Sequence, residues 1–175
     1  PDQWKFNPHK IRQKDIDARW TKKNFVTFYG YKNHIKADTK TKLIEDYIVT
    51  DASVHDSQVI EALLSEKDRG KPLYADSAYC GEEQQKVYKK KEVIDRVHEK
   101  GYRNKALTEK QKADNREKSK VRARVEHVFG FVENSMNGSI LRTIGIVRAN
   151  AKIGMMNLVY NINRCTQLKI QVSMG

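Results

Sequence analysis

Two runs of β-branched and aromatic residues, separated by a short polar segment, open the patterned part of the chain. Residues 25–31 and 34–37 form the first run, and residues 43–49 form the second. Val, Ile, Phe and Tyr at this density are typical of strands. The segment DTKT at 38–41 has the composition of a turn, and so short a connection joins antiparallel neighbours. The pattern therefore predicts a β-hairpin.

Two shorter strands are expected further along the chain. Residues 73–79 predict a buried strand that Pro72 begins, and residues 93–98 predict another. Asp76 lies where the first of these strands gives way to a loop. A carboxylate in that position projects from the edge of a sheet, where ligands of α/β proteins gather. The alternative is that Asp76 only caps a turn.

Apolar residues at helical spacing mark the remaining segments. The spacing predicts helices over residues 53–64, 82–91 and 108–134. A last helix carries the stripe Ile146, Ala149, Ile153, Met156 and Tyr160. We expect this stripe to pack across the sheet, and a contact between copies of the chain is the alternative.

The helix over 108–134 combines an apolar stripe with a very basic surface. Its stripe consists of Val121, Val125, Val128, Phe129 and Val132. Glu126 borders this stripe, so we expect its carboxylate to be half sheltered. Arg122 lies one turn earlier, and a surface Arg–Glu pair at this spacing contributes only about 0.2–0.5 kcal/mol. An acid at the rim of a buried face, facing Asp76 at a strand end, suits metal binding better.

Residues 1–24 show neither the two-residue period of a strand nor the 3.6-residue period of a helix. Their aromatic residues are scattered among lysines and arginines. Such a segment can follow a phosphate backbone and stack on exposed bases, or it is a solvated linker whose tryptophans pack on the domain. We divide the chain into a basic irregular segment over 1–24, an α/β domain over 25–168 and a tail over 169–175.

The composition restricts the class of protein and the kind of partner. A chain of 175 residues is long enough for one domain with an ordinary core. Its net charge of +12 points to a polyanionic partner, of which nucleic acid is the commonest. No apolar run approaches the roughly 20 residues of a membrane span. Cys80 and Cys165 stand outside any Cys/His cluster, which disfavours zinc and fits free thiols in a reducing cytosol, with a single disulfide left open.

Several motifs resemble those of bacterial insertion-sequence transposases of the DDE, RNase H-like class. The segments that carry the resemblance are YADSAY at 74–79, VHDS at 54–57 and, above all, RARVEHVFG at 122–130. Further similar segments lie at 17–23, 29–34, 142–145 and 152–158. The resemblance covers nearly the whole chain, with the motifs in the family's order.

The resemblance implies an RNase H-like mixed sheet with flanking helices and a function in cutting and transferring DNA strands. Asp76 corresponds to the second catalytic carboxylate and Glu126 to the third, both as ligands of Mg²⁺ or Mn²⁺. Arg122 corresponds to the arginine four residues before that Glu. Two such ions can activate the attacking oxygen and stabilise the leaving oxygen at phosphorus. The implied partner is double-stranded DNA at transposon ends and target, and the implied location is the cytoplasm, at the nucleoid.

The basic surface is expected to hold the DNA backbone through phosphate contacts, which position the duplex without reading its sequence. The candidates are Lys22, Lys23, Lys100, Arg103, Lys105, Arg116, Lys118, Lys120, Arg122 and Arg124. His34 is expected to face the neighbouring strand, and an accessory role at the site is the alternative. Glu133 departs from the family, which often has a basic residue seven positions after the catalytic Glu.

The family's sheet begins with a strand that carries the first catalytic Asp, and no strand-like run precedes the hairpin here. Asp15 and Asp17 lie in the irregular basic segment, and the chain begins with Pro1. We therefore interpret the chain as the C-terminal part of a longer or disrupted transposase that lacks the first strand of its sheet. We expect open sheet edges, marginal stability, a tendency to aggregate and no metal-dependent cleavage by this chain alone.

Two other functions fit the same residues. One is a nucleic-acid-binding module without catalysis, and the other is a metal-dependent nuclease on the same fold. Strand transfer of a transposon end separates a transposase from a nuclease, and metal-dependent cleavage separates both from a binding module.

Overall fold

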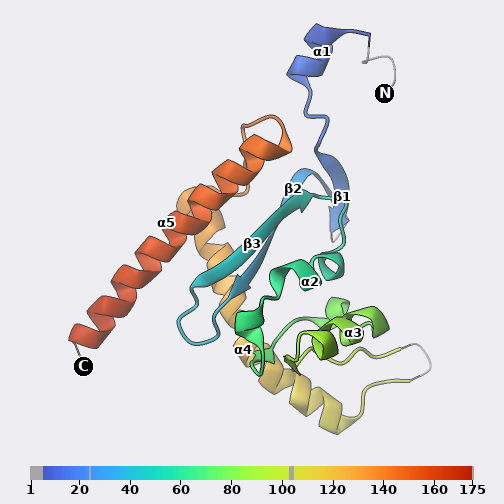
Figure 1. Cartoon of the computed structure of the whole chain (residues 1–175), viewed down its shortest axis with the longest axis vertical. Helices are drawn as coiled ribbons and strands as arrows, with labels where there is room; N and C mark the ends of the chain where they lie inside the picture. The colour runs from blue at the N-terminus through green and yellow to red at the C-terminus, as the bar shows by residue number, and fades with distance from the viewer. Residues whose placement is uncertain (1–5, 24, 103–104, 175) are drawn as a thin grey trace. The chain divides into compact units, whose positions relative to one another are not determined.

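The computed structural model describes residues 6–23, 25–102 and 105–174, which form a mixed α/β structure (Figure 1). In chain order the elements are α1 (Pro8–Gln13), β1 (Arg19–Lys23), β2 (Val26–Ala37), β3 (Ile44–Asp51), η2 (Asp56–Gln58), α2 (Ile60–Leu63), η3 (Glu66–Asp68), β4 (Pro72–Leu73), η4 (Ser77–Tyr79), α3 (Glu82–Lys90), β5 (Ile94–Asp95), α4 (Glu109–Met136) and α5 (Ile146–Ser173), where η marks a 3₁₀ turn. The chain divides into two compact units. The first comprises the residues up to Ile35, 47–54 and 130 onward, and the second comprises 36–46 and 55–129.

The predicted hairpin is confirmed, with β2 and β3 as neighbours in a sheet of order β1-β2-β3. β2 is one continuous strand, rather than two pieces. Asp38 holds the turn, because its Oδ1 accepts hydrogen bonds from the backbone N–H and the hydroxyl of Thr41, both at 2.6 Å. His34 is buried, and its Nε2 lies 2.9 Å from Thr50 Oγ1 on β3. The histidine therefore faces the neighbouring strand, as expected.

The expectation that residues 1–24 are irregular is wrong for the described part of that segment. It contains α1 and β1, and β1 pairs antiparallel with β2 from Arg19↔Gly30 to Lys23↔Val26. The rings of Trp20 and Tyr29 face each other across this pair, with centroids 4.8 Å apart. A strand of five residues is too short to show a period in the sequence, and its pairing with β2 outweighs the lysines, which disfavour strands.

Asp15 and Asp17 have a structural role at the start of α5. Asp15 Oδ2 accepts a hydrogen bond from the N–H of Gly145 at 3.1 Å, and Asp17 Oδ2 accepts one from Ile146 at 2.9 Å. Carboxylates at a helix N-terminus satisfy unpaired N–H groups and oppose the helix dipole. Tyr31 donates a 2.6 Å hydrogen bond to Asp15 Oδ1 and so ties this cap to β2.

α5 packs on the first unit through the predicted stripe, where Ala149, Ile153, Met156 and Tyr160 are buried. The helix extends to Ser173, through most of the segment that the sequence assigned to a tail. Asn157 is also buried and exchanges side-chain hydrogen bonds with Asn33 on β2. At Gly154 a Cβ would overlap the hydroxyl of Tyr47, so the glycine allows β3 to approach the helix closely.

The second unit has a core of its own. Ile60, Leu64, Tyr88 and Val97 are its buried members. The helices α3 and α4 are confirmed within two residues of their predicted bounds, and α4 begins at a capping box in which Thr108 and Gln111 exchange hydrogen bonds. The helix expected over 53–64 is instead the 3₁₀ turn η2 followed by the short α2, because the His55 side chain caps η2.

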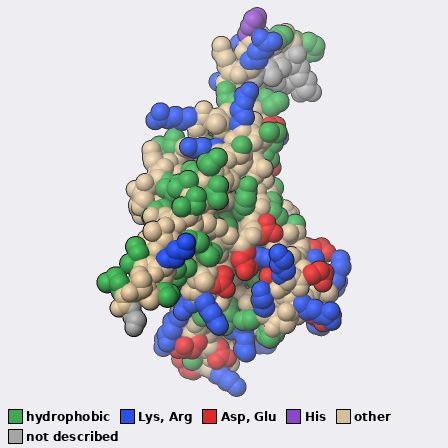
Figure 2. Space-filling view, turned by 60° about the vertical axis from the view of Figure 1, so that its left-hand side comes forward, with side chains coloured by type: hydrophobic (Ala, Val, Ile, Leu, Met, Phe, Trp, Pro, Cys, Tyr) green, Lys and Arg blue, Asp and Glu red, His purple; other side chains and the backbone are tan. Residues whose placement is uncertain are grey.

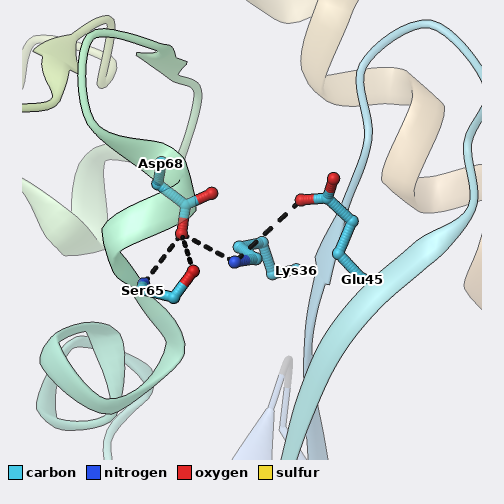
Figure 3. Close-up of polar contacts among 4 residues, drawn as sticks. All are labelled: Lys36, Glu45, Ser65 and Asp68. Atoms are coloured by element: carbon cyan, nitrogen blue, oxygen red, sulfur yellow. Dashed lines mark hydrogen bonds and ion pairs between the residues drawn. The ribbon is translucent and has the colours of Figure 1, made fainter.

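An ion pair in the second unit holds the end of β2 against η3 (Figure 3). Lys36 Nζ donates to Asp68 Oδ2 at 2.7 Å, and the two side chains are only 15% and 9% exposed. The same oxygen accepts hydrogen bonds from the N–H and hydroxyl of Ser65, and Glu45 lies 4.0 Å from the ammonium. Burial raises the pKa of Asp68, but the hydrogen bonds from Lys36 and Ser65 outweigh it and lower the pKa below its usual value.

We predict that Lys36→Met destabilises the protein by about 3 kcal/mol, because it leaves the buried carboxylate without its countercharge. Urea unfolding at pH 7 measures the loss. The folded-state pKa of Asp68 is depressed, so the pair contributes fully above the unfolded pKa of about 4 and its contribution is lost as pH falls through the folded value. The difference between wild type and variant should therefore shrink in acid. Lys67→Met, at an exposed lysine of η3, is the control; equal losses in both variants contradict the prediction.

Candidate functional site

The candidate site begins with the parallel pairing of β4 and β5. Pro72 pairs with Ile94 and Leu73 with Asp95. The pairing continues beyond the strands, since the N–H of His98 donates to the carbonyl of Ala75 at 3.1 Å. Asp76 and His98 therefore lie at the same end of the two paired segments. This is the carboxyl end, where ligands of parallel sheets gather.

Asp76 caps the turn that follows β4. The strand predicted over 73–79 is shorter, because residues 77–79 form η4. Asp76 Oδ1 accepts a 2.8 Å hydrogen bond from the N–H of Ala78. The capping interpretation is thus confirmed, and the cap fixes the direction of a carboxylate that stays partly exposed. Burial raises the pKa of Tyr79 next to it, and the negative charges of Asp56 and Asp76 add to this increase.

Glu126 and Arg122 form an ion pair along α4. Arg122 Nη2 lies 2.8 Å from Glu126 Oε1, and the two side chains are 32% and 57% exposed. Glu126 is therefore more open to solvent than a half-sheltered rim position implies. The Nε of Arg122 is buried and has no hydrogen-bond partner among the described residues, so this arginine retains one unused donor.

His98 lies within electrostatic reach of both parts of the site. Its Nε2 is 3.3 Å from the hydroxyl of Ser119, which precedes Arg122 by three residues on α4. Burial lowers the pKa of His98 first, the positive charges of Arg122 and Lys118 lower it further, and the carboxylate of Asp76 opposes them. His98 thus contacts α4 through Ser119, and the Arg122–Glu126 pair lies on the same helix.

His98 was not among the site residues predicted from the sequence. The sequence contained one signal for it, because His98 is the last residue of the strand predicted over 93–98. Two adjacent parallel strands place their carboxyl ends at one edge. The sequence did not show that these strands are adjacent and parallel.

The basic residues of α4 fall into two groups. Arg116, Lys120 and Arg124 are exposed and follow one another at four-residue spacing, so they share one face of the helix. Lys118 and Arg122 lie on another face and are partly buried. Lys118 Nζ donates to the carbonyl of Val97 at 3.0 Å, so it braces the helix against the segment after β5.

The remaining predicted DNA contacts lie elsewhere. Lys100 and Lys105 are exposed in the loop before α4, and Arg103 of the same loop lies outside the described residues. Lys22 and Lys23 are exposed on β1 of the first unit, where the ammonium of Lys22 lies 5.7 Å from the ring centre of Phe25.

Within the described ranges, no three His, Cys, Asp or Glu side chains are grouped closely enough to hold a metal ion. Cys80 and Cys165 are both free thiols, as expected. None of the helices in this part of the chain is both long and apolar enough to cross a bilayer.

A strand-end carboxylate, an Arg–Glu ion pair and an exposed basic helix face thus lie within the second unit. The family described as "Transposase DDE domain" matches residues 5–162, and the chain belongs to this family. Over 149 residues the chain is 32% identical to the transposase for insertion sequence element IS1106 of Neisseria meningitidis serogroup B. The alignment covers 85% of this chain and 51% of the relative, so the chain spans about half the relative's length. No solved structure matches it. The transposase family predicted from the motifs is confirmed.

Proposed function

We propose that this chain acts in the transposition of an insertion sequence, as a domain that binds double-stranded DNA and contributes Asp76 and Glu126 to a divalent metal site. The observation that carries the proposal is that Asp76 and His98 lie at the same end of the parallel β4–β5 segments, while His98 contacts Ser119 on the helix that carries Arg122 and Glu126. Membership of the transposase family supports it. The exposed basic residues Arg116, Lys120 and Arg124 lie on the helix that carries Glu126, about 200° around its axis from the face of Lys118, Arg122 and Glu126, so they offer DNA a second face of the same helix.

The residues present fit Mg²⁺. Mg²⁺ prefers carboxylate oxygens, keeps several waters and is commonly held by one or two carboxylates together with phosphates of the substrate. Asp76 and Glu126 supply two such carboxylates without a third protein ligand. When bound, the metal activates the attacking oxygen and stabilises the leaving oxygen of the phosphodiester.

The surrounding side chains prepare the site for phosphate. Arg122 orients Glu126 through their ion pair. The cap to Ala78 fixes Asp76. Burial and the positive charges of Arg122 and Lys118 lower the pKa of His98, which disfavours the charged imidazolium beside Arg122.

We also propose the RNase H-like arrangement for this α/β domain. An RNase H-like sheet is a single mixed sheet, whereas the described strands form two separate sheets, β1-β2-β3 with an antiparallel β1–β2 pair and a parallel β4–β5 pair, so the proposal rests on the family resemblance. The chain alone is expected not to cleave DNA. Asp15 and Asp17 cap α5, while Asp38 and Asp51 accept hydrogen bonds within their own turns, so these four have structural roles. Metal-dependent cleavage by this chain would require Asp38, Asp46 or Asp51 to act as the first carboxylate.

A binding module without catalysis remains the competing function, because it requires only the basic face of α4. A response to metal separates the two functions. A binding module holds DNA equally well with and without Mg²⁺, and its affinity for Mn²⁺ does not depend on Asp76.

For the metal site, we expect Asp76→Asn to weaken Mn²⁺ binding at least about tenfold, because it removes one charged ligand. Mn²⁺ titration followed by electron paramagnetic resonance measures the change. The fold should be retained, since Asn also caps turns through its side-chain oxygen. Asp95→Asn, which changes an exposed carboxylate on β5, is the matched control. Equal affinities in the wild type and Asp76→Asn contradict the metal proposal but leave DNA binding possible.

For DNA binding, replacing Arg116, Lys120 and Arg124 together by Gln should weaken affinity for duplex DNA and flatten its salt dependence. The slope of log K against log salt should decrease by about 0.9 for each phosphate that the variant no longer neutralises. Fluorescence anisotropy over a salt series measures both quantities. Gln at Lys71, Lys86 and Lys89, which are exposed in the same unit, removes the same charge away from α4. If the two triple variants lose the same affinity, the α4 face is not the DNA surface.

A further inference from the structure

α5 has a second apolar stripe, on the side of the helix away from its core contacts. Met155, Leu158, Ile162 and Val172 are 59%, 52%, 58% and 83% exposed. Each of the first three lies two residues after a buried position of the core stripe, and two residues correspond to about 200° of helical rotation. Figure 2 shows hydrophobic side chains gathered along this surface.

The stripe follows a heptad repeat. The positions Ala151, Met155, Leu158, Ile162, Cys165, Lys169 and Val172 are separated by four and three residues in alternation. Met155, Ile162 and Lys169 are then the a positions, and the others are the d positions. An a/d pattern sustained over three heptads is the signature of a helix that pairs with another helix.

We propose that α5 forms a parallel, in-register, two-stranded coiled coil with α5 of a second copy of this chain. The central heptad has Leu158 at d and Ile162 at a, which is the combination that favours two parallel strands. A single Lys at an a position, here Lys169, fixes register and the number of strands at some cost in stability.

The flanking positions also fit an identical partner. Charged residues at e and g set the choice and orientation of the partner through salt bridges between the helices. Here the e positions are Lys152, Val159, Thr166 and Ser173, and the g positions within the stripe are Gly154, Asn161 and Leu168. α5 contains no Asp or Glu, so it offers no acidic group to a basic partner helix, and the apolar centre of the stripe carries no charge that repels its own copy.

Sedimentation equilibrium of the purified 175-residue chain, without DNA, tests the proposal. We expect a monomer–dimer equilibrium in which Ile162→Asp weakens association about 30-fold or more. Lys169→Leu should strengthen it about tenfold, because it removes the like charges at the seam. Ile162 is exposed in the monomer, so Ile162→Asp should leave the far-ultraviolet circular dichroism unchanged.

Asn163→Asp is the matched control. It adds the same charge one residue further along the same helix, at an exposed b position, and its Oδ1 still accepts the hydrogen bond from Gln167. Association that survives Ile162→Asp, or that Asn163→Asp weakens equally, overturns the proposal, and so does a chain that stays monomeric. These outcomes do not depend on the proposed DNA and metal functions.

Cys165 reports the direction and register of the helices. In a parallel, in-register pair, each d residue meets its own copy, so the two Cys165 thiols lie within reach of one another. In a Cys80→Ser background, oxidation by copper phenanthroline should convert the dimer into a disulfide-linked species. A dimer that Ile162→Asp disrupts but that forms no such crosslink contradicts the parallel arrangement.

Discussion

The parallel pairing of β4 with β5 is the constraint on which the candidate site depends. Its hydrogen bonds continue past the strands to His98 and Ala75. The segments that follow β4 and β5 therefore both begin at the same edge of this two-stranded sheet. The cap of Asp76 on Ala78 and the contact of His98 with Ser119 then connect that edge to α4. None of these bonds is strong alone. Together they set which side chains of a long exposed helix face the strand ends.

α4 serves two purposes with two of its faces. One face is braced by Lys118 and carries the Arg122–Glu126 pair, whereas the face of Arg116 and Arg124 is exposed, with Arg124 donating to the carbonyl of Thr39. A similar division holds for α5, whose core stripe is buried while the stripe around Ile162 is exposed. In both helices some exposed residues take no part in packing the fold. We assign DNA as the partner of the exposed basic face of α4, and a second copy of the chain as the partner of the exposed apolar stripe of α5.

Long periodic elements could be predicted from the sequence, and short ones could not. The β2–β3 hairpin and α4 follow from patterns that extend over many residues. β1 was missed, because five residues including three basic ones show no period and form a strand only by pairing with β2. Asp76 and Glu126 were found through motif resemblance. His98 was not, because its place at the site depends on a pairing of distant segments that no local pattern reveals.

The central claim is that Asp76 and Glu126 hold one divalent metal ion beside bound DNA. A crystal structure of the chain with Mn²⁺ and a short duplex tests it most directly, because anomalous scattering locates the ion without reference to the protein coordinates. The account predicts an anomalous peak bonded to carboxylate oxygens of both Asp76 and Glu126, with the duplex along the exposed face of α4. Mn²⁺ bound elsewhere, or the two carboxylates on opposite faces of the domain, would contradict it.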